Sequence, residues 1–167
     1  KKPYQLDIKK SENEVIFLNI QGFQKLLPDF DILLVNIIKN IANSKIWMID
    51  SNNVNLNDKL KTRIQKTFKQ YNIDFEKHII FNKRLGYQGY LEIINKSDII
   101  IDPIGCVSGF TTTIECLSLN KPIITFPQKL IRTRQTYAIL KRIGVLDTVV
   151  TSFKHYIQLA VKLSNDV

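Results

Sequence analysis

The sequence predicts an α/β protein with a Rossmann-like, doubly wound parallel sheet. Five or six short runs are continuously apolar instead of alternating with polar residues, which is typical of strands buried on both faces. Each run is followed by a longer segment with helical spacing of apolar residues. Strands that alternate with helices pair in parallel through right-handed crossovers, so the helices cover both faces of the sheet.

The apolar runs place the strands. The first run, VIFLNI, has no charged residue, and the later runs KIWMID, HIIF, DIIID and PIITF keep the same apolar centre. A sixth and shorter run, TVV, lies near the C-terminus. The strands are therefore expected at residues 15–20, 45–50, 78–81, 98–102, 122–126 and 148–150.

Apolar spacing places the helices. After Pro28, isoleucine and valine recur every three residues on one helical face, and Asp29 or Asp31 is expected to cap that helix. Leu60, Ile64 and Phe68 form the stripe of the next helix. The helices are expected at residues 31–42, 57–71, 89–95, 111–119, 132–143 and 152–164.

The chain has 167 residues, which is the size of one domain, and we expect residues 1–14 to lead into a single domain over 15–167. The net charge of +9 fits nucleic acid, an anionic membrane or a phosphorylated ligand. Scattered lysines argue against nucleic acid, and no apolar run reaches the roughly 20 residues of a membrane span. The first residue is Lys, which suggests a piece of a longer chain.

Two cysteines, Cys106 and Cys116, form no CxxC pair and have no histidine nearby in sequence. This spacing favours neither a metal site nor a disulfide framework, and it predicts a reduced, cytoplasmic protein. Neither histidine suggests catalysis, because His78 is expected to open a strand and His155 to lie on a late helix with an apolar face.

Doubly wound sheets bind ligands beyond the carboxyl ends of their strands. The loops expected to line a site therefore follow Ile20, Asp50, Phe81, Asp102 and Phe126. The segment after Asp102 is chemically the most unusual, because it combines glycines with a run of three threonines.

That segment has two interpretations. A helix that begins at Thr111 would direct free N–H groups and threonine hydroxyls at a phosphate, and Glu115 one turn later could accept hydrogen bonds from a ribose. Alternatively, the three threonines cap the helix, and Thr112 with Glu115 forms a capping box that needs no ligand. The segment is neither a Walker A loop nor a GxGxxG fingerprint.

The chain resembles the O-GlcNAc transferase family, and its bacterial members in particular. Seven segments follow the family's order and spacing from about residue 15 to residue 166, among them NIQGFQKLLP at 19–28 and HIIFNKRLGYQGYL at 78–91. The family's central pattern is present here as Asp98, Asp102-Pro103, Gly109-Phe110-Thr111-Thr112, Glu115, Pro122, Thr125, Pro127, Leu130 and Arg134.

The resemblance implies the C-terminal lobe of a GT-B fold, which binds a UDP-sugar in a cleft that faces an N-terminal lobe. Lys25 would bind the diphosphate and help UDP to leave, because negative charge builds up there as the glycosidic bond breaks. By itself, Lys25 could also be an ordinary solvated lysine. Thr111 and Thr112 would bind the diphosphate, together with Gly109 and Phe110 just before them.

The resemblance also implies a nucleoside site. Glu115 would bind the ribose, and the backbone of Leu85 would contact the edge of the base. Tyr90 would stack on uracil, although a tyrosine there could equally belong to the core. Arg134 would steady the loop after the fifth strand, or cap a helix.

The implied function is transfer of GlcNAc or a hexose from a UDP-sugar to a protein Ser/Thr or similar acceptor, without a cofactor or metal. The partners would be the UDP-sugar, a protein or glycan acceptor and the N-terminal lobe. Gly22 and Phe110 depart from the family pattern and motivate an alternative, a non-catalytic nucleotide-binding or scaffold module. Another GT-B-like enzyme, such as a sugar-nucleotide epimerase, is a third possibility. Asn120 replaces a glycine where left-handed backbone is expected.

Overall fold

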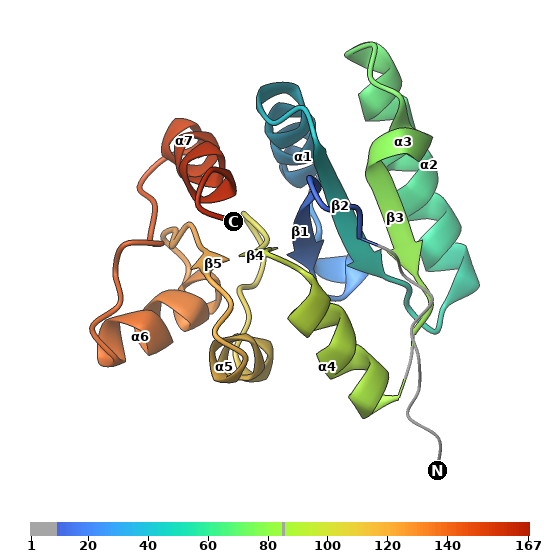
Figure 1. The fold of residues 1–167 in the computed structure, drawn as a ribbon. Coiled ribbons are helices and arrows are strands. Elements are labelled where there is room, and N and C mark those ends of the chain that lie inside the picture. The colour runs from blue at the N-terminus through green and yellow to red at the C-terminus, as the bar shows by residue number, and fades with distance from the viewer. Residues whose placement is uncertain (1–9, 85) are drawn as a thin grey trace.

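Five parallel strands form one sheet in the computed structural model, which describes residues 10–84 and 86–167 (Figure 1). The strand order is β3-β2-β1-β4-β5, and every pairing is parallel. The chain therefore winds outward from β1 to β3 and then returns to place β4 on the other side of β1. The strands are β1 (Val15–Asn19), β2 (Ser44–Ile49), β3 (Ile79–Asn82), β4 (Ile99–Ile101) and β5 (Ile123–Ile124).

Helices follow the strands on both faces of the sheet, as predicted. In chain order, the helical elements are η1 (Phe23–Lys25), α1 (Pro28–Asn40), α2 (Val54–Gln70), α3 (Phe75–His78), α4 (Tyr87–Lys96), α5 (Thr111–Ser118), η2 (Ile131–Arg134), α6 (Gln135–Arg142) and α7 (Phe153–Ser164). Here η denotes a 3-10 helix. Helices α1, α2 and α7 lie on one side of the sheet, and α4 and α5 on the other (Figure 1).

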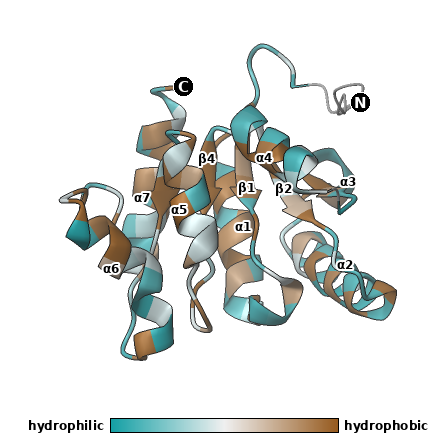
Figure 2. Cartoon of the chain, turned by 90° about the horizontal axis from the view of Figure 1, so that it is seen from below, coloured by the Kyte–Doolittle hydropathy of each residue, from teal (hydrophilic) through white to brown (hydrophobic). Residues whose placement is uncertain are grey.

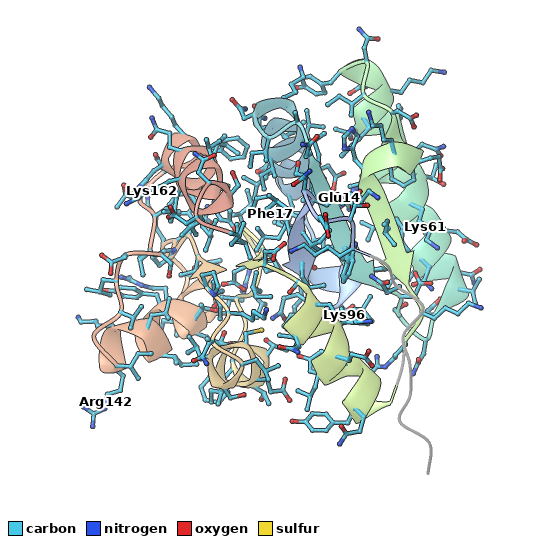
Figure 3. All side chains as sticks on the ribbon, viewed as in Figure 1. Glu14, Phe17, Lys61, Lys96, Arg142 and Lys162 are labelled. Atoms are coloured by element: carbon cyan, nitrogen blue, oxygen red, sulfur yellow. The ribbon has the colours of Figure 1, made fainter. Side chains whose placement is uncertain are left out.

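Two apolar clusters show how alternate residues of each strand face opposite helix layers. Phe17 and Met48 belong to the cluster under α1, α2 and α7, whereas Leu18 and Trp47 belong to the cluster under α4 and α5. All four side chains are fully buried. The strands are accordingly hydrophobic in the centre of Figure 2, and α2 carries both hydrophobic and hydrophilic residues along its length. In Figure 3, Phe17 lies in the interior and Arg142 points outward.

The five main strands and the helices around them confirm the predicted fold class, but some details differ. The TVV run makes only a single bridge between Val149 and Thr125. The helix expected over 132–143 is divided into η2 and α6. The short helix α3 was not predicted, and His78 ends that helix instead of opening a strand. Asn120 has a φ of 55°, which confirms the left-handed backbone expected there.

Two predicted helix starts were wrong. Helix α1 begins at Pro28, so Asp29 and Asp31 lie in its first turn and neither is the cap residue. Proline suits that position because its missing N–H has no acceptor there in any case. Helix α2 begins three residues before its predicted start, since the side chain of Asn53 accepts a hydrogen bond from the Leu56 N–H.

Asp31 instead forms a buried ion pair that joins α1 to α2. Its side chain is 1% exposed and accepts from Arg63 Nε at 2.7 Å and Arg63 Nη2 at 2.9 Å. Burial raises the pKa of Asp31, and Arg63 opposes that rise. Arg63 Nη2 also donates to the carbonyl of Leu26 at 2.9 Å. The same guanidinium therefore holds the segment that follows Lys25.

Replacing Arg63 with Met should lower the free energy of unfolding by roughly 3 kcal/mol, because Asp31 would be left buried without its partner. Urea denaturation measures the loss. Lys66→Met, at an exposed lysine of the same helix, should stay within about 0.5 kcal/mol of the unmodified protein. Adding Asp31→Asn to Arg63→Met should recover part of the loss, and no recovery would contradict the ion-pair explanation.

Candidate functional site

A cavity of about 610 Å³ opens at the carboxyl end of the sheet, where the strand order reverses between β1 and β4. Side chains from both sides of the reversal line it, as the rule for doubly wound sheets predicts. Its wall is formed by Ile20, Gln21, Gly22, Gln24, Lys25, Ile49, Asp50, Ser51, Arg84, Tyr87, Tyr90, Ile93, Thr111, Thr112 and Glu115.

The structure brings five of the predicted site residues to this one cavity, namely Lys25, Tyr90, Thr111, Thr112 and Glu115. They come from η1, α4 and α5, which are far apart in sequence. Gly109 and Phe110 are not part of the wall, and Phe110 is 59% exposed. Leu85 lies outside the described residues. Among the described residues, the loop after Phe126 adds nothing to the wall, since β5 is at the edge of the sheet.

A chain of hydrogen bonds connects the two sides of the cavity. Lys25 Nζ donates to Gln21 Oε1 at 2.8 Å, and Gln21 Nε2 donates to Thr112 Oγ1 at 2.6 Å. Gln21 is 6% exposed and follows β1 by two residues. The ammonium group and the threonine hydroxyl are thus held by a single amide.

Helix α5 begins at Thr111, as predicted, but its threonines do not cap it. The N-cap residue is Phe110, and no side chain caps the helix there. The capping-box interpretation of Thr112 and Glu115 was therefore wrong. As the first residues of the helix, Thr111 and Thr112 present N–H groups that no earlier turn can accept, and the helix dipole adds positive potential. This end of the cavity suits an anion.

The other end of the cavity is aromatic and acidic. The Tyr90 hydroxyl donates to Glu115 Oε2 at 2.8 Å. Burial and the neighbouring Glu115 carboxylate raise the pKa of Tyr90, so its hydroxyl keeps its proton and remains a donor. Tyr87 stacks on Tyr90 with ring centroids 6.2 Å apart, and Tyr87 is 61% exposed. The pair offers a flat surface beside a carboxylate.

Gly109 does not line the cavity, but it packs closely against two side chains in its wall, those of Gln21 and Thr112. A Cβ atom there would lie 2.6 Å from Thr112 Oγ1, 2.7 Å from Gln21 Nε2 and 2.8 Å from Thr113 Oγ1. No side chain other than hydrogen fits between those atoms. The absence of a side chain at residue 109 therefore permits the hydrogen bond between Gln21 and Thr112.

A buried carboxylate holds Gly109 in place. Asp102 accepts from the Gly109 N–H at 2.9 Å and from Thr125 Oγ1 at 2.8 Å. Burial raises the pKa of Asp102 from 3.8 to about 6, although these hydrogen bonds and the charge of Lys25 oppose the rise. The Tyr156 hydroxyl supports the same turn by donating to the Asp102 carbonyl at 3.0 Å.

Sequence reasoning missed several residues of the wall, notably Gln21, Asp50, Arg84 and Tyr87. Gln21 and Asp50 lie within two residues of the ends of β1 and β2, so the carboxyl-end rule could have indicated the loops that contain them. Asp50 is paired with Lys61 at 3.5 Å. Arg84 adds a second cation to the same wall.

Within residues 10–84 and 86–167, no three His, Cys, Asp or Glu side chains are grouped so as to hold a metal ion. Both cysteines carry free thiols, and burial raises the pKa of Cys116 to about 12. In the same ranges, none of the helices has the length and apolar character needed to cross a membrane.

The fold and the cavity at the strand-order reversal define a Rossmann-like lobe of the kind found in GT-B glycosyltransferases. The chain belongs to glycosyl transferase family 41, whose family model matches residues 3–167. The resemblance to O-GlcNAc transferases is thereby confirmed. Membership also favours a glycosyltransferase over the epimerase-like possibility.

Individual relatives and solved structures that resemble the chain are consistent with this family. The chain is 21% identical over 155 residues to the UDP-N-acetylglucosamine–peptide N-acetylglucosaminyltransferase of Caenorhabditis elegans. It superposes on a mutant O-GlcNAc transferase of Thermobaculum terrenum with a TM-score of 0.82 and 18% identity. A glycosyltransferase of lipopolysaccharide biosynthesis gives a TM-score of 0.61 at 13% identity, over 93% of this chain and 39% of that one.

This chain is much shorter than its relatives. The alignment covers 93% of the chain but 13% of the worm protein. The superposition covers 95% of the chain and 30% of the bacterial protein. The chain therefore corresponds to one part of a larger glycosyltransferase architecture.

Gly109→Ala should lower the free energy of unfolding by about 1–3 kcal/mol, because the added methyl group overlaps Gln21, Thr112 and Thr113. Gly86→Ala is the matched control, since a Cβ at Gly86 meets no atom within 4 Å, and it should cost less than Gly109→Ala, because only the N-cap preference of α4 changes. Chemical denaturation of both variants tests the packing, and equal stabilities would contradict it.

Asp102 should make stability fall as pH rises between about 4 and 6. The folded-state pKa is raised, so the folded protein binds the proton more tightly than the unfolded chain, and that advantage is lost as pH rises through about 6. The shift corresponds to roughly 3 kcal/mol. Urea denaturation at several pH values should show a smaller decline in Asp102→Asn, and identical slopes would contradict the assignment.

Proposed function

We propose that the chain binds a UDP-sugar in the 610 Å³ cavity and forms the donor-binding part of a glycosyltransferase. The observation that carries the proposal is the convergence of Lys25 and Thr112 on one amide at the N-terminal end of α5. It places an ammonium group, a hydroxyl and free helix N–H groups around the same space. That donor set fits a diphosphate.

The diphosphate occupies this cationic end in the proposed complex. Thr111 and Thr112 contribute N–H groups and hydroxyls, and Lys25 contributes a positive charge. When the bond between the sugar and the diphosphate breaks, negative charge accumulates on the departing UDP. Lys25 stabilises that charge more strongly in the transition state than in the bound donor, which is how a fixed cation accelerates the step. The proposed chemistry uses no metal.

The nucleoside occupies the aromatic end. Glu115 accepts hydrogen bonds from the ribose hydroxyls, and the Tyr90 hydroxyl fixes the orientation of that carboxylate. The uracil stacks on the tyrosine pair, of which Tyr87 is the more exposed ring and Tyr90 the inner one.

The acceptor is proposed to be a hydroxyl of a protein Ser/Thr or of a similar acceptor such as a glycan, and the transferred sugar is proposed to be GlcNAc or a hexose. An N-terminal lobe outside this chain would supply the acceptor groove and any catalytic base. The chain by itself should therefore bind UDP without turnover, and we expect the parent protein to act in the cytoplasm.

A non-catalytic module remains the second candidate, and one observation favours it. The Phe110 side chain, beside the threonine pair, is 59% exposed and is not part of the cavity wall. A phenylalanine side chain has no polar group, so it offers the donor no hydrogen bond. A parent protein that binds no UDP would favour this scaffold role.

Titration calorimetry with UDP tests the proposal. Binding should be micromolar to sub-millimolar, and Thr112→Val and Lys25→Met should each weaken it roughly tenfold or more, because each removes a hydrogen bond to a charged group. Lys154→Met, at an exposed lysine of α7, is the matched control and should bind like the unmodified chain.

Absence of binding in a folded sample would have two explanations, which titration of the full-length parent separates. Binding by the parent alone would mean that the other lobe completes the site. Absence of binding by the parent as well would contradict the proposed function.

A further inference from the structure

We infer that Gln21 is a positioning residue that presents Lys25 and Thr112 to the diphosphate as two hydrogen-bond donors. The inference rests on the proposed function and adds to it a residue that no motif indicated. Gln21 touches both side chains, at 2.8 Å and 2.6 Å, and shares the cavity wall with them.

The direction of the two hydrogen bonds fixes how the amide lies. The ammonium group of Lys25 has only donors, so the Gln21 oxygen must face it and the Gln21 nitrogen must face Thr112. A flipped amide would direct N–H groups at a cation. Lys25 thus determines the orientation of the amide, and the amide in turn determines the hydrogen bond that Thr112 receives.

This arrangement leaves the Thr112 proton available. A threonine hydroxyl has one proton and two acceptor positions. Because Gln21 Nε2 donates to Thr112 Oγ1, the threonine proton cannot be directed at Gln21. The neighbouring Thr113 hydroxyl pairs with Thr136 at 3.0 Å and is buried. Thr112 is therefore left to donate to a ligand oxygen in the cavity.

The amide is also electrically neutral, which preserves the charge of Lys25 for the ligand. A carboxylate in the same position would pair with the ammonium group and compete with the diphosphate. It would also accept the Thr112 proton and remove that donor from the cavity. Glutamate has nearly the same shape as glutamine, so exchanging one for the other changes charge and donor pattern with little change of volume.

Packing locks the amide in this position. Gln21 is 6% exposed, and a Cβ at Gly109 would lie 2.7 Å from its nitrogen, so the glycine backbone lies directly against it. Asp102 holds that glycine through the Gly109 N–H. The amide therefore lies in a preformed setting before any ligand arrives.

The test is Gln21→Glu, titrated with UDP and, separately, with uridine, in the same form of the protein that binds UDP. UDP affinity should fall roughly 10- to 100-fold, because the substitution weakens the hydrogen bonds that Lys25 and Thr112 donate to the charged diphosphate. Uridine affinity, followed by NMR, should change less than about twofold, because uridine carries no diphosphate. A merely structural role would weaken both ligands equally.

Gln88→Glu is the matched control, because Gln88 is exposed on α4 and is not part of the cavity wall. It adds the same charge without meeting Lys25 and Thr112, and should weaken UDP only about twofold. Gln21→Met removes both hydrogen bonds without adding charge and should give an intermediate loss. It replaces Gln21→Glu as the decisive variant if the glutamate variant does not fold.

Three results would overturn the inference. Gln21→Glu could bind UDP as tightly as Gln88→Glu does. Its affinity for uridine could fall as much as its affinity for UDP. Gln21→Met could bind UDP as tightly as the unmodified protein. If Thr112→Val and Lys25→Met still weaken UDP as expected, only the role of Gln21 fails. If the unmodified protein binds no UDP in any form, the proposed function fails with it.

Discussion

The parallel pairing of β1 with β4 is the contact on which the candidate site depends. It joins parts of the chain that are 82 residues apart, as the hydrogen bond from Asn19 Nδ2 to the Ile101 carbonyl shows. At the amino end, the Asp98 carboxylate accepts the Ile16 N–H at 2.8 Å. Because both strands run in the same direction, their carboxyl ends emerge together, and Gln21 meets Thr112 across the gap between them.

Much of the fold could be predicted because it follows from the burial of single strands. A strand covered by helices on both faces must be apolar at every position, and the runs that contain Phe17 and Trp47 meet that condition. The same reasoning located the carboxyl ends of the strands. It thereby indicated Thr111, Thr112 and Glu115 before their positions in space were known.

What could not be predicted depends on side chains that meet across the fold. The carboxyl-end rule indicates the loop that contains both Gln21 and the exposed Gln24, but it cannot show which amide is buried, because that is decided by Gly109 and Thr112. The capping-box pattern of Thr112 and Glu115 misled for the same reason. Both side chains find partners on other elements, Gln21 and Tyr90, and such partners do not appear in local spacing.

Helix α2 shows how far the site's dependence extends. Val54–Gln70 adds no residue to the cavity wall, yet Arg63 holds the carbonyl of Leu26, the residue after Lys25. One hydrogen bond and one peptide linkage therefore connect Arg63, on a helix that covers the sheet, to the cation at the sheet's carboxyl end. Natural selection acting on ligand affinity would therefore restrict amino-acid choice at a position that no ligand reaches, and surveys of functional residues based on proximity alone would overlook it.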